Sequence, residues 1–380
     1  MADVLVAVGG MDLGGIETFI MNVYRKIDPG FVRFDFLLPH DRNYFFADEI
    51  RDRGGRLYFI DESRKHPIKM RKKLDAFFCE HCYDVVWENK GSLNSMAILF
   101  AAKRSGVPRR ILHSHASTSS VFDIRSAMNY AIHSVNRRRI GAATDFYACS
   151  PEAADWFGFD RSGKAVKWKF VPNGIDVARF AFDDEKRNRV RDALGFGVET
   201  FVVGNVARLV SVKNHIFLLE SFAFLQSSCS KARLLLVGSG PMKAEIIAKA
   251  SALGIWEKVT LLEDRMDTDE LYSAMDVFAF PSKAEGLGLA LIEAQAAGLP
   301  CVVSKGVPSR ALICEGCQVV DLADGATKWA DEIKHVATFG RNSKGPEKVR
   351  NAGFDIARVA ADIQADFIRV TKDQKRGFGV

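Results

Sequence analysis

The sequence predicts an α/β fold made of two doubly wound domains, each a mostly parallel sheet covered by helices. Short apolar runs alternate with amphipathic stretches along the whole chain at intervals of roughly 15–30 residues, which is typical of βαβ units. The chain has 380 residues, whereas single hydrophobic cores stop growing at about 250–300 residues. Pro172 and the pair Asn173-Gly174 interrupt the alternation and mark the predicted junction.

The first series of apolar runs predicts a domain over residues 1–170. Its first run leads through Gly14-Gly15 into a helical pattern over residues 17–27. The strand-like runs of this series are residues 4–8, 34–38, 57–60, 84–87, 110–113 and 145–149. The final helical stretch, residues 354–380, is expected to pack back on this domain.

A second series begins at residues 169–171 and predicts a second domain over residues 171–353. Its further runs are residues 200–205, 233–238, 258–261, 277–280 and 300–304. Ligands of open parallel sheets bind beyond the carboxyl ends of the strands. Motifs at the strand ends of both domains are therefore expected to converge on a cleft between two facing domains.

The composition is that of an ordinary globular protein and argues against several classes. A formal net charge of +6 is too weak to predict a nucleic-acid partner, and no RNA-binding or zinc-finger motif is present. Apolar runs stay shorter than the roughly 18 residues of a membrane span. The first residues resemble a strand rather than a signal peptide. We expect a cytoplasmic protein whose Cys79/Cys82 and Cys314/Cys317 pairs are chance placements.

Two strand ends of the first domain carry residues suited to a ligand. Gly14 and Gly15 allow the backbone to approach a phosphate or a sugar, although any tight turn between a strand and a helix uses glycine. His113 and His115 end the fifth run, where an imidazole can donate a hydrogen bond or take a proton near neutral pH. The alternative is a structural hydrogen bond beneath the sheet edge, which is the stronger reading for His113.

Two cations follow the run 200–205 in the second domain. Arg208 and Lys213 lie where cations can neutralise a departing diphosphate, although as isolated surface charges they would be unremarkable. Their significance depends on the groups that share their end of the sheet.

Two carboxylates in the second domain flank a predicted helix start. Glu285 lies in a glycine-containing loop, and Glu293 lies about two turns into the apolar helix that follows. Free backbone N–H groups at a helix start suit a phosphate, and flanking carboxylates suit sugar hydroxyls. The loop that would supply these groups consists of Gly286, Leu287, Gly288 and Leu289. The arrangement predicts a site for an activated sugar.

No cofactor and no metal are expected. Neither the glycines after the first run nor Gly238-Ser239-Gly240 complete the Gly-x-Gly-x-x-Gly fingerprint of nicotinamide-binding proteins. Asp267-Thr268-Asp269 matches an Asp-x-Asp metal motif, but acids at the start of a predicted helix are explained by capping.

A basic amphipathic stretch over residues 63–81 has two readings that do not exclude each other. It can be an outer helix of the first domain with its apolar face inward, and it can contact an anionic membrane. Arg137-Arg138-Arg139 would extend the same basic surface.

In order and spacing, these motifs resemble the retaining glycosyltransferases of the GT-B fold, group 1, of the type found in exopolysaccharide and capsule assembly. The resemblance covers almost the whole chain. It rests on residues 14–18, 110–115, 148–150, 171–176, Arg208, Lys213, 280–282, 285–293 and 294–300. Lys283-Ala284 lies where the family varies next to the donor sugar, which leaves the sugar open.

The resemblance implies a role for each candidate residue. It implies that Glu285 lies near the donor sugar, Glu293 binds the nucleotide ribose, and Arg208 and Lys213 hold the diphosphate. The loop from Gly286 to Leu289 and Gly238 would complete the donor site in the second domain.

The first domain would bind the acceptor. Gly14, Gly15, His113 and His115 would lie there, with Gly15 in a loop that also meets the donor and His115 in the active site.

The predicted function is transfer of a hexosyl unit, with retention and without metal, from a nucleotide diphosphate sugar, with a UDP-sugar as the expected donor. The acceptor would be lipid-linked or an oligosaccharide in cell-surface polysaccharide synthesis, and the protein would be cytoplasmic or peripheral on the membrane. Three alternatives stay open: a nucleotide-sugar epimerase of the same fold, a catalytically silent nucleotide-binding partner subunit, and, less favoured, a dehydrogenase.

Overall fold

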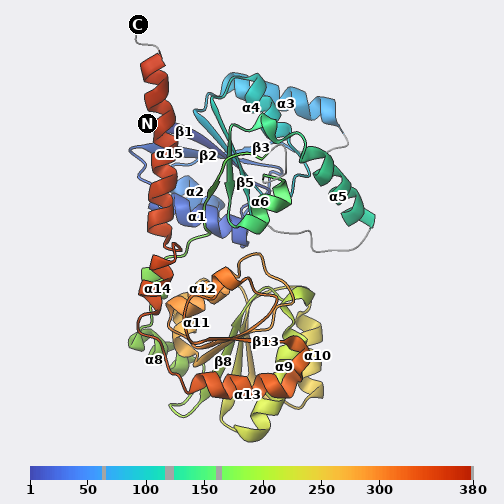
Figure 1. The fold of residues 1–380 in the computed structure, drawn as a ribbon, viewed down its shortest axis with the longest axis vertical. Coiled ribbons are helices and arrows are strands. Elements are labelled where there is room, and N and C mark those ends of the chain that lie inside the picture. The colour runs from blue at the N-terminus through green and yellow to red at the C-terminus, as the bar shows by residue number, and fades with distance from the viewer. Residues whose placement is uncertain (62–65, 116–123, 160–164, 378–380) are drawn as a thin grey trace. The chain divides into compact units, whose positions relative to one another are not determined.

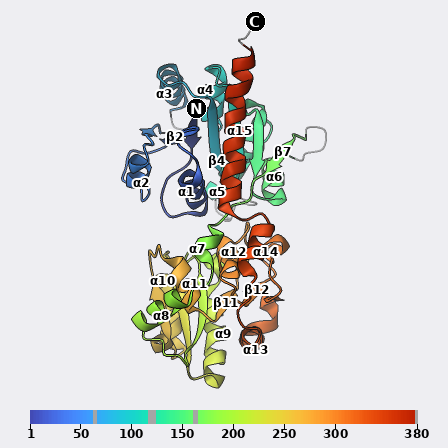
Figure 2. The same ribbon diagram turned by 90° about the vertical axis from the view of Figure 1, so that its left-hand side faces the viewer.

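The structure is a computed structural model that describes residues 1–61, 66–115, 124–159 and 165–377. It divides into two compact units, a first unit of Met1–Gly174 with Ile356–Val380 and a second unit of Ile175–Asp355. Figures 1 and 2 show each unit as a sheet with helices on both faces. The predicted fold class, two α/β domains with parallel sheets, is confirmed.

The first unit contains a seven-stranded sheet in the order β3-β2-β1-β4-β5-β6-β7, in which neighbouring strands run parallel. Its strands are β1 (Ala2–Ala7), β2 (Val32–Leu38), β3 (Leu57–Phe59), β4 (Val85–Lys90), β5 (Arg109–Ser114), β6 (Asp145–Ala148) and β7 (Trp168–Phe170). Its helices are α1 (Gly15–Lys26), α2 (Ala47–Asp52), α3 (Pro67–Glu80), α4 (Ala97–Arg104), α5 (Ile124–Asn136), α6 (Pro151–Phe157) and α15 (Ile356–Gly377).

Strand β7 corrects one expectation from the sequence. The run at residues 169–171 was expected to open the second series, but β7 pairs with β6 at the edge of the first sheet. A three-residue strand gives no sequence signal for its partner, because pairing depends on register with a neighbour rather than on its own pattern.

The two faces of the first sheet have separate cores. Val4 and Val6 of β1 lie in a cluster with α1 and α15, whereas Leu5 and Ala7 lie in a cluster with α3, α4 and α6. Successive side chains of a strand point to opposite faces, and a parallel strand is buried on both. The continuous apolar run at residues 4–8 follows from this double burial.

Helix α15 returns to the first unit at the end of the chain. The Phe367 ring centroid lies 6.0 Å from that of Phe34 and 5.6 Å from that of Trp87. Asp366 accepts a hydrogen bond from the Tyr147 hydroxyl at 2.8 Å and pairs with Lys169 at 2.6 Å. Apolar and ionic contacts together fix this helix to the first sheet.

The second unit contains a six-stranded parallel sheet in the order β10-β9-β8-β11-β12-β13. Its strands are β8 (Phe201–Val206), β9 (Ala232–Val237), β10 (Val259–Leu262), β11 (Val277–Phe280), β12 (Cys301–Ser304) and β13 (Cys317–Val320). Its helices are α7 (Val177–Phe180), α8 (Asp184–Ala193), α9 (His215–Ser228), α10 (Lys243–Ala252), α11 (Thr268–Ala274), α12 (Leu289–Ala296), α13 (Gly325–Ala337) and α14 (Gly345–Asn351). Strand β13 was not predicted from the sequence.

Each sheet reverses its winding once. The strand order turns at β1/β4 in the first unit and at β8/β11 in the second. The loops that leave neighbouring strands in opposite directions open a crevice at such a point, and ligands of open α/β sheets bind there.

Candidate active site

Loops after four neighbouring strands meet at the carboxyl edge of the second sheet. The Lys283 N–H donates to the Val212 carbonyl at 2.8 Å, which ties the loop after β11 to the loop after β8. The Glu285 N–H donates to the Gly306 carbonyl at 3.0 Å, which ties it to the loop after β12. Backbone hydrogen bonds therefore fix the positions from which the predicted site residues project.

Gly238 joins the loop after β9 to this group by close backbone approach. Its φ is +145°, and a Cβ atom there would lie 2.0 Å from the Ala207 carbonyl oxygen. The next residue, Ser239, accepts a hydrogen bond from the Leu209 N–H at 2.9 Å. Packing alone thus requires glycine at position 238, and its contact with a donor stays a prediction.

Lys213 and Glu285 form the central charged pair of the second unit. Nζ of Lys213 lies 2.6 Å from Oε1 and 2.8 Å from Oε2 of Glu285. The Lys213 side chain is 21% exposed and that of Glu285 is 6% exposed. Nζ also lies 5.4 Å from the centroid of the Phe280 ring. The carboxylate and the ring orient the ammonium group at the strand edge.

Arg208 lies in the same loop as Lys213. Arg208 is exposed, whereas the neighbouring Leu209 is fully buried and anchors the loop. The anchored backbone carries a solvent-facing guanidinium, which is the group best shaped for bidentate contact with a phosphate.

The start of α12 presents backbone N–H groups. Gly288 precedes the helix with φ +84°, a left-handed conformation, and no side chain caps the helix start. The N–H groups of Leu291 and Ile292 both go to the Gly288 carbonyl. The first N–H groups of a helix, here those of Leu289 and Ala290, have no partner within it. They suit an anion, as the sequence predicts.

The other loop residues take different positions. Leu287 is buried in the core under α12, so its contribution to a ligand would come from its backbone. A Cβ atom on Gly286 would meet nothing within 4 Å, so this position borders open space.

Glu293 projects from α12 and meets Tyr272 of α11. The Tyr272 hydroxyl lies 2.9 Å from Oε2 of Glu293 and 3.0 Å from the Ala290 carbonyl oxygen. Burial raises the pKa of Glu293 to about 7, although the hydrogen bond from Tyr272 favours the charged form. Near neutral pH this carboxyl group is therefore poised between its two protonation states.

The Asp-x-Asp motif is occupied by cations of the protein. Asp269 is buried in the first turn of α11 and pairs with Arg179 at 2.7 Å and Lys186 at 2.8 Å. As expected, Asp267 occupies the N-cap position and Asp269 lies in the first turn, but the Asp267 side chain pairs with Arg265 and makes no capping bond. Within the described residues, no cluster of three His, Cys, Asp or Glu side chains could hold a metal.

In the first unit, His115 is held by two amides. Its Nε2 lies 2.9 Å from Oδ1 of Asn89, and its Nδ1 lies 3.3 Å from Oδ1 of Asn173. Burial lowers the pKa of His115 to about 3, so the ring is neutral near pH 7. The Asn89 amide nitrogen donates to the Trp87 carbonyl at 3.1 Å, which leaves its oxygen to accept the Nε2 hydrogen. His115 is thus suited to hydrogen bonding rather than to proton uptake.

The remaining predicted residues of the first unit differ in accessibility. His113 is fully buried and accepts a hydrogen bond from the Trp87 indole at 3.3 Å. That contact matches the structural alternative, and its proposed contact with an acceptor stays a prediction. Gly14 precedes α1, and a Cβ atom on Gly15 would meet nothing within 4 Å.

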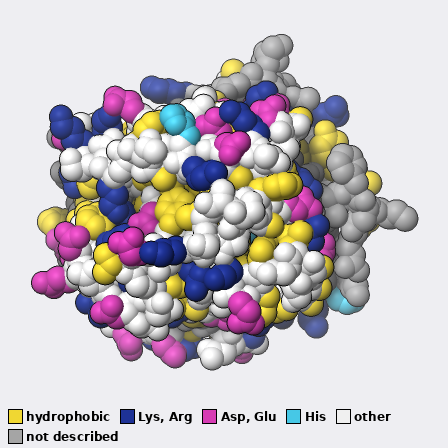
Figure 3. All heavy atoms as spheres, turned by 90° about the horizontal axis from the view of Figure 1, so that it is seen from below, with side chains coloured by type: hydrophobic (Ala, Val, Ile, Leu, Met, Phe, Trp, Pro, Cys, Tyr) yellow, Lys and Arg dark blue, Asp and Glu magenta, His cyan; other side chains and the backbone are white. Residues whose placement is uncertain are grey.

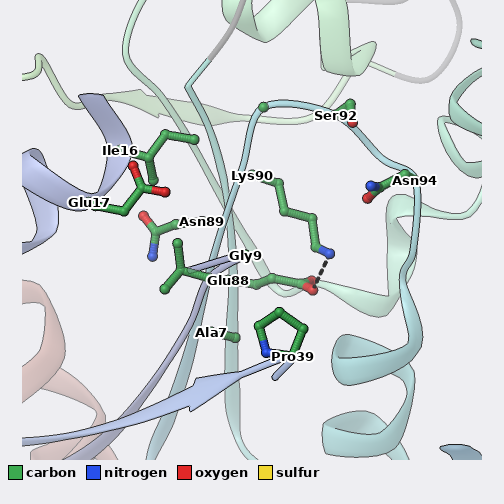
Figure 4. Close-up of a pocket in the computed structure, with 12 residues that line it drawn as sticks. Ala7, Gly9, Ile16, Glu17, Pro39, Glu88, Asn89, Lys90, Ser92 and Asn94 are labelled. Carbon is green, nitrogen blue, oxygen red and sulfur yellow. Dashed lines mark ion pairs between the residues drawn. The ribbon is translucent and has the colours of Figure 1, made fainter. Parts of the chain in front are cut away.

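Glu88, Asn89 and Lys90 at the end of β4 were not among the predicted site residues. Glu88 pairs with Lys90 at 3.1 Å and lines a cavity with it (Figure 4). The sequence signal for these residues is that three polar residues end a buried strand. Because this strand lies at the winding reversal of the sheet, such residues indicate a ligand site.

Comparison with known proteins shows the family of the chain. The model of the family "Glycosyl transferases group 1" matches residues 186–344. EpsF of Bacillus subtilis (strain 168), whose name assigns it provisionally to the glycosyltransferases, is 30% identical over 98% of both chains. The chain therefore belongs to the group 1 glycosyltransferase family.

Two further proteins show the range of the similarity. A GDP-mannose-dependent alpha-(1-6)-phosphatidylinositol monomannoside mannosyltransferase of Mycolicibacterium smegmatis is 30% identical over 82% of both chains. Anabaena HepE, solved in complex with UDP-glucose, superposes with a TM-score of 0.74 at 19% identity, covering 96% of this chain and 99% of that chain. This structural likeness supports the GT-B fold implied by the resemblance.

Proposed function

We propose that the protein transfers a hexosyl unit, with retention of anomeric configuration, from a nucleotide diphosphate sugar to a lipid-linked or oligosaccharide acceptor in cell-surface polysaccharide synthesis. The observation that carries this proposal is the Lys213–Glu285 pair in the same loop system as the uncapped start of α12. A cation and free amides suit a diphosphate, and a carboxylate suits the sugar attached to it.

The proposed chemistry follows from where charge develops. The glycosidic bond to the diphosphate breaks, and negative charge collects on the leaving group while the sugar becomes oxocarbenium-like. Arg208, Lys213 and the first amides of α12 would stabilise the leaving group. The acceptor hydroxyl would attack on the same face and pass its proton to the departing phosphate. Glu285 would lie by the sugar, with its charge moderated by Lys213.

Glu293 is the proposed ribose-binding group. An ionised carboxylate accepts two hydrogen bonds from neighbouring hydroxyls, and the Tyr272 contact fixes its orientation. The relatives differ in their donors: the mycobacterial enzyme is named for GDP-mannose, and HepE was solved with UDP-glucose. We favour a UDP-sugar, and the proposed role of His115 is contact with the transferred sugar, as the resemblance implies.

Metal independence is part of the proposal. The cations that pair with Asp267 and Asp269 already balance the motif that would otherwise suggest a metal. Turnover that persists in EDTA would support this, whereas turnover restored only by added Mg²⁺ or Mn²⁺ would contradict it.

Membrane contact through the basic stretch is proposed for the described part, α3, because residues 62–65 lie outside the described residues. Helix α3 buries Leu74, Phe77 and Phe78 and exposes its basic residues, with Ile68 74% exposed. The exposed cations are Lys69, Arg71, Lys72 and Lys73. No described helix has the length and apolar character of a membrane span. Vesicle co-sedimentation of the wild type and of K69E/K72E/K73E, with and without anionic lipid, tests this contact.

Nucleic acid is not a proposed partner. Basic and acidic side chains are interspersed on the face drawn in Figure 3, and the net charge of the chain is only +6.

The proposal is tested by assaying Glu285→Ala with a radiolabelled UDP- and GDP-sugar panel and membrane-extracted acceptor. Undiminished transfer by the variant would contradict the site assignment. A sugar nucleotide converted without any acceptor would favour the epimerase, and nucleotide binding without turnover would favour the silent subunit.

A further inference from the structure

The first unit has a cavity at the winding reversal of its sheet. It has a volume of about 350 Å³ and lies where β1 and β4 end, between the start of α1 and the loop after β4 (Figure 4). Cavities that bind small molecules begin at about this size. Its lining includes Ile16, Glu17, Pro39, Glu88, Lys90 and Asn94.

An ion pair forms the floor of this cavity. Glu88 and Lys90 are two positions apart on β4, so their side chains project from the same face of the strand. Their charged atoms lie 3.1 Å apart, with the Glu88 side chain 1% exposed and that of Lys90 13% exposed. A buried ion pair costs desolvation free energy, and it stabilises the fold less than apolar packing of the same volume would. A pair in this place is better explained by ligand recognition.

The wall of the cavity is held by side chains from α5 and α6. Nδ1 of His133 accepts the Leu93 N–H at 2.9 Å, and the Asn136 amide donates to the Leu93 carbonyl at 2.7 Å. The Trp156 indole donates to the Gly91 carbonyl at 3.0 Å. The imidazole stacks on that indole with centroids 4.0 Å apart. Three side chains therefore fix the loop that carries Asn94 before any ligand binds.

The lining discriminates between two kinds of acceptor chemistry. Glu17 and Glu88 are carboxylates and Lys90 is a cation, so the ionised lining is net negative and disfavours phosphate. Carboxylates accept hydrogen bonds from hydroxyls, whereas Lys90 and the amide of Asn94 donate to oxygen. Ile16 and Pro39 offer apolar surface to the carbon-bound hydrogens of a ring. These groups together match a neutral sugar.

We infer that this cavity binds the acceptor through the hydroxyl groups of a neutral sugar ring, with Glu88 and Lys90 as specificity-determining residues. The inference rests on the proposed transfer function, which it deepens by stating what part of the acceptor the first unit recognises. In a lipid-linked acceptor, this cavity would accordingly bind the sugar and not the phosphate.

Binding is tested without donor and without turnover. Octyl glucoside, octyl galactoside, octyl N-acetylglucosaminide and octyl phosphate, below their micelle concentrations, are titrated into the full chain by saturation-transfer NMR. We expect at least one glycoside to bind more tightly than octyl phosphate. Glu88→Gln should weaken that glycoside about tenfold, because a charge-assisted hydrogen bond is lost. Tighter binding of octyl phosphate, or no binding of any glycoside, would overturn the inference.

Two variants keep the test independent of folding. Asn94 is exposed, so Asn94→Ala should fold and still weaken the glycoside, whereas Glu80→Gln on the exposed end of α3 should leave it unchanged. Equal binding by Glu88→Gln, Asn94→Ala and the wild type would overturn the inference. Thermal shifts with UDP and GDP are measured on the same samples. Their absence would contradict the donor site of the proposed function while the glycoside result still decides the cavity.

Discussion

The two units position polar groups in different ways. In the second unit, short loops are tied to one another through their backbones, and one ion pair, Lys213–Glu285, lies among them. In the first unit, polar side chains project from a buried strand and are held by other side chains, as His115 is held by Asn89 and Asn173. Backbone-built sites need glycines at set spacing and so leave a sequence motif, whereas strand-built sites depend on which face a residue occupies.

The largest effect is expected when the negative charge of the Lys213–Glu285 pair is removed. Glu285→Gln should reduce transfer by about 10²–10³-fold, the range seen when one preorganised electrostatic group is removed from an active site. Nucleotide binding should change only a few-fold, because Lys213 and the α12 amides remain. Initial rates and nucleotide titrations measure the two effects. Glu270→Gln, which loses a surface pair with Arg189, is the matched control and should keep wild-type rates.

Acid should destabilise the first unit more than the second. Burial lowers the pKa of His113, His115 and His133 below the ordinary 6.5, so below that pH the unfolded chain binds protons that the native unit does not. Stability is then lost as pH falls, by up to about 4 kcal/mol per pH unit for three groups. In the second unit, His215, with a pKa of about 4, acts in the same direction. Glu293, with its pKa raised to about 7, stabilises the native state on acidification and offsets the destabilising effect of His215.

Hydrogen exchange between pH 6.5 and 5, corrected for intrinsic rates and followed separately for peptides of each unit, measures this difference. His133→Gln should reduce the slope in the first unit, and His40→Gln, at an exposed position, should not. Equal slopes in the two units would contradict the comparison.

Glycine substitutions should separate packing from ligand access. Gly238→Ala places Cβ 2.0 Å from the Ala207 carbonyl oxygen at an unfavourable φ, and we expect a loss of about 2 kcal/mol in the free energy of unfolding. Gly15→Ala meets nothing within 4 Å and should change that free energy by less than about 0.5 kcal/mol. Urea denaturation compares them. A larger loss for Gly15→Ala than for Gly238→Ala would contradict the claim that packing requires glycine at position 238 and not at position 15.

The smallest expected effect is a pH dependence of nucleotide affinity. Because the pKa of Glu293 is about 7 in the free protein, its ionised fraction falls between pH 8 and 6. If the ionised form accepts the ribose hydroxyls, the dissociation constant for the nucleotide should rise about tenfold over that range. Calorimetric titration measures it, and Glu293→Gln should flatten the profile. A wild-type affinity that is independent of pH would exclude this role.

Some of this structure could be predicted from the sequence and some could not. Alternating apolar runs predicted the two parallel sheets, and a glycine-containing loop followed by an apolar helical pattern predicted the start of α12 between Glu285 and Glu293. The partner of β7 could not be predicted, because a strand's register is set by its neighbour. Glu88 was missed because its position at the end of a buried strand indicates a site only once the order of the strands in the sheet is known. The pairing of Asp269 with Arg179 was also missed, since these residues are distant in sequence and meet only through the packing of α11.

The most direct test of the central claim, that the second unit binds a nucleotide diphosphate sugar, is hydrogen exchange of the whole chain with and without UDP, and separately GDP, in EDTA. We predict added protection in residues 207–213, 238–242 and 281–293 with at least one of the two nucleotides. No protection with either nucleotide, or protection confined to the first unit, would contradict the claim.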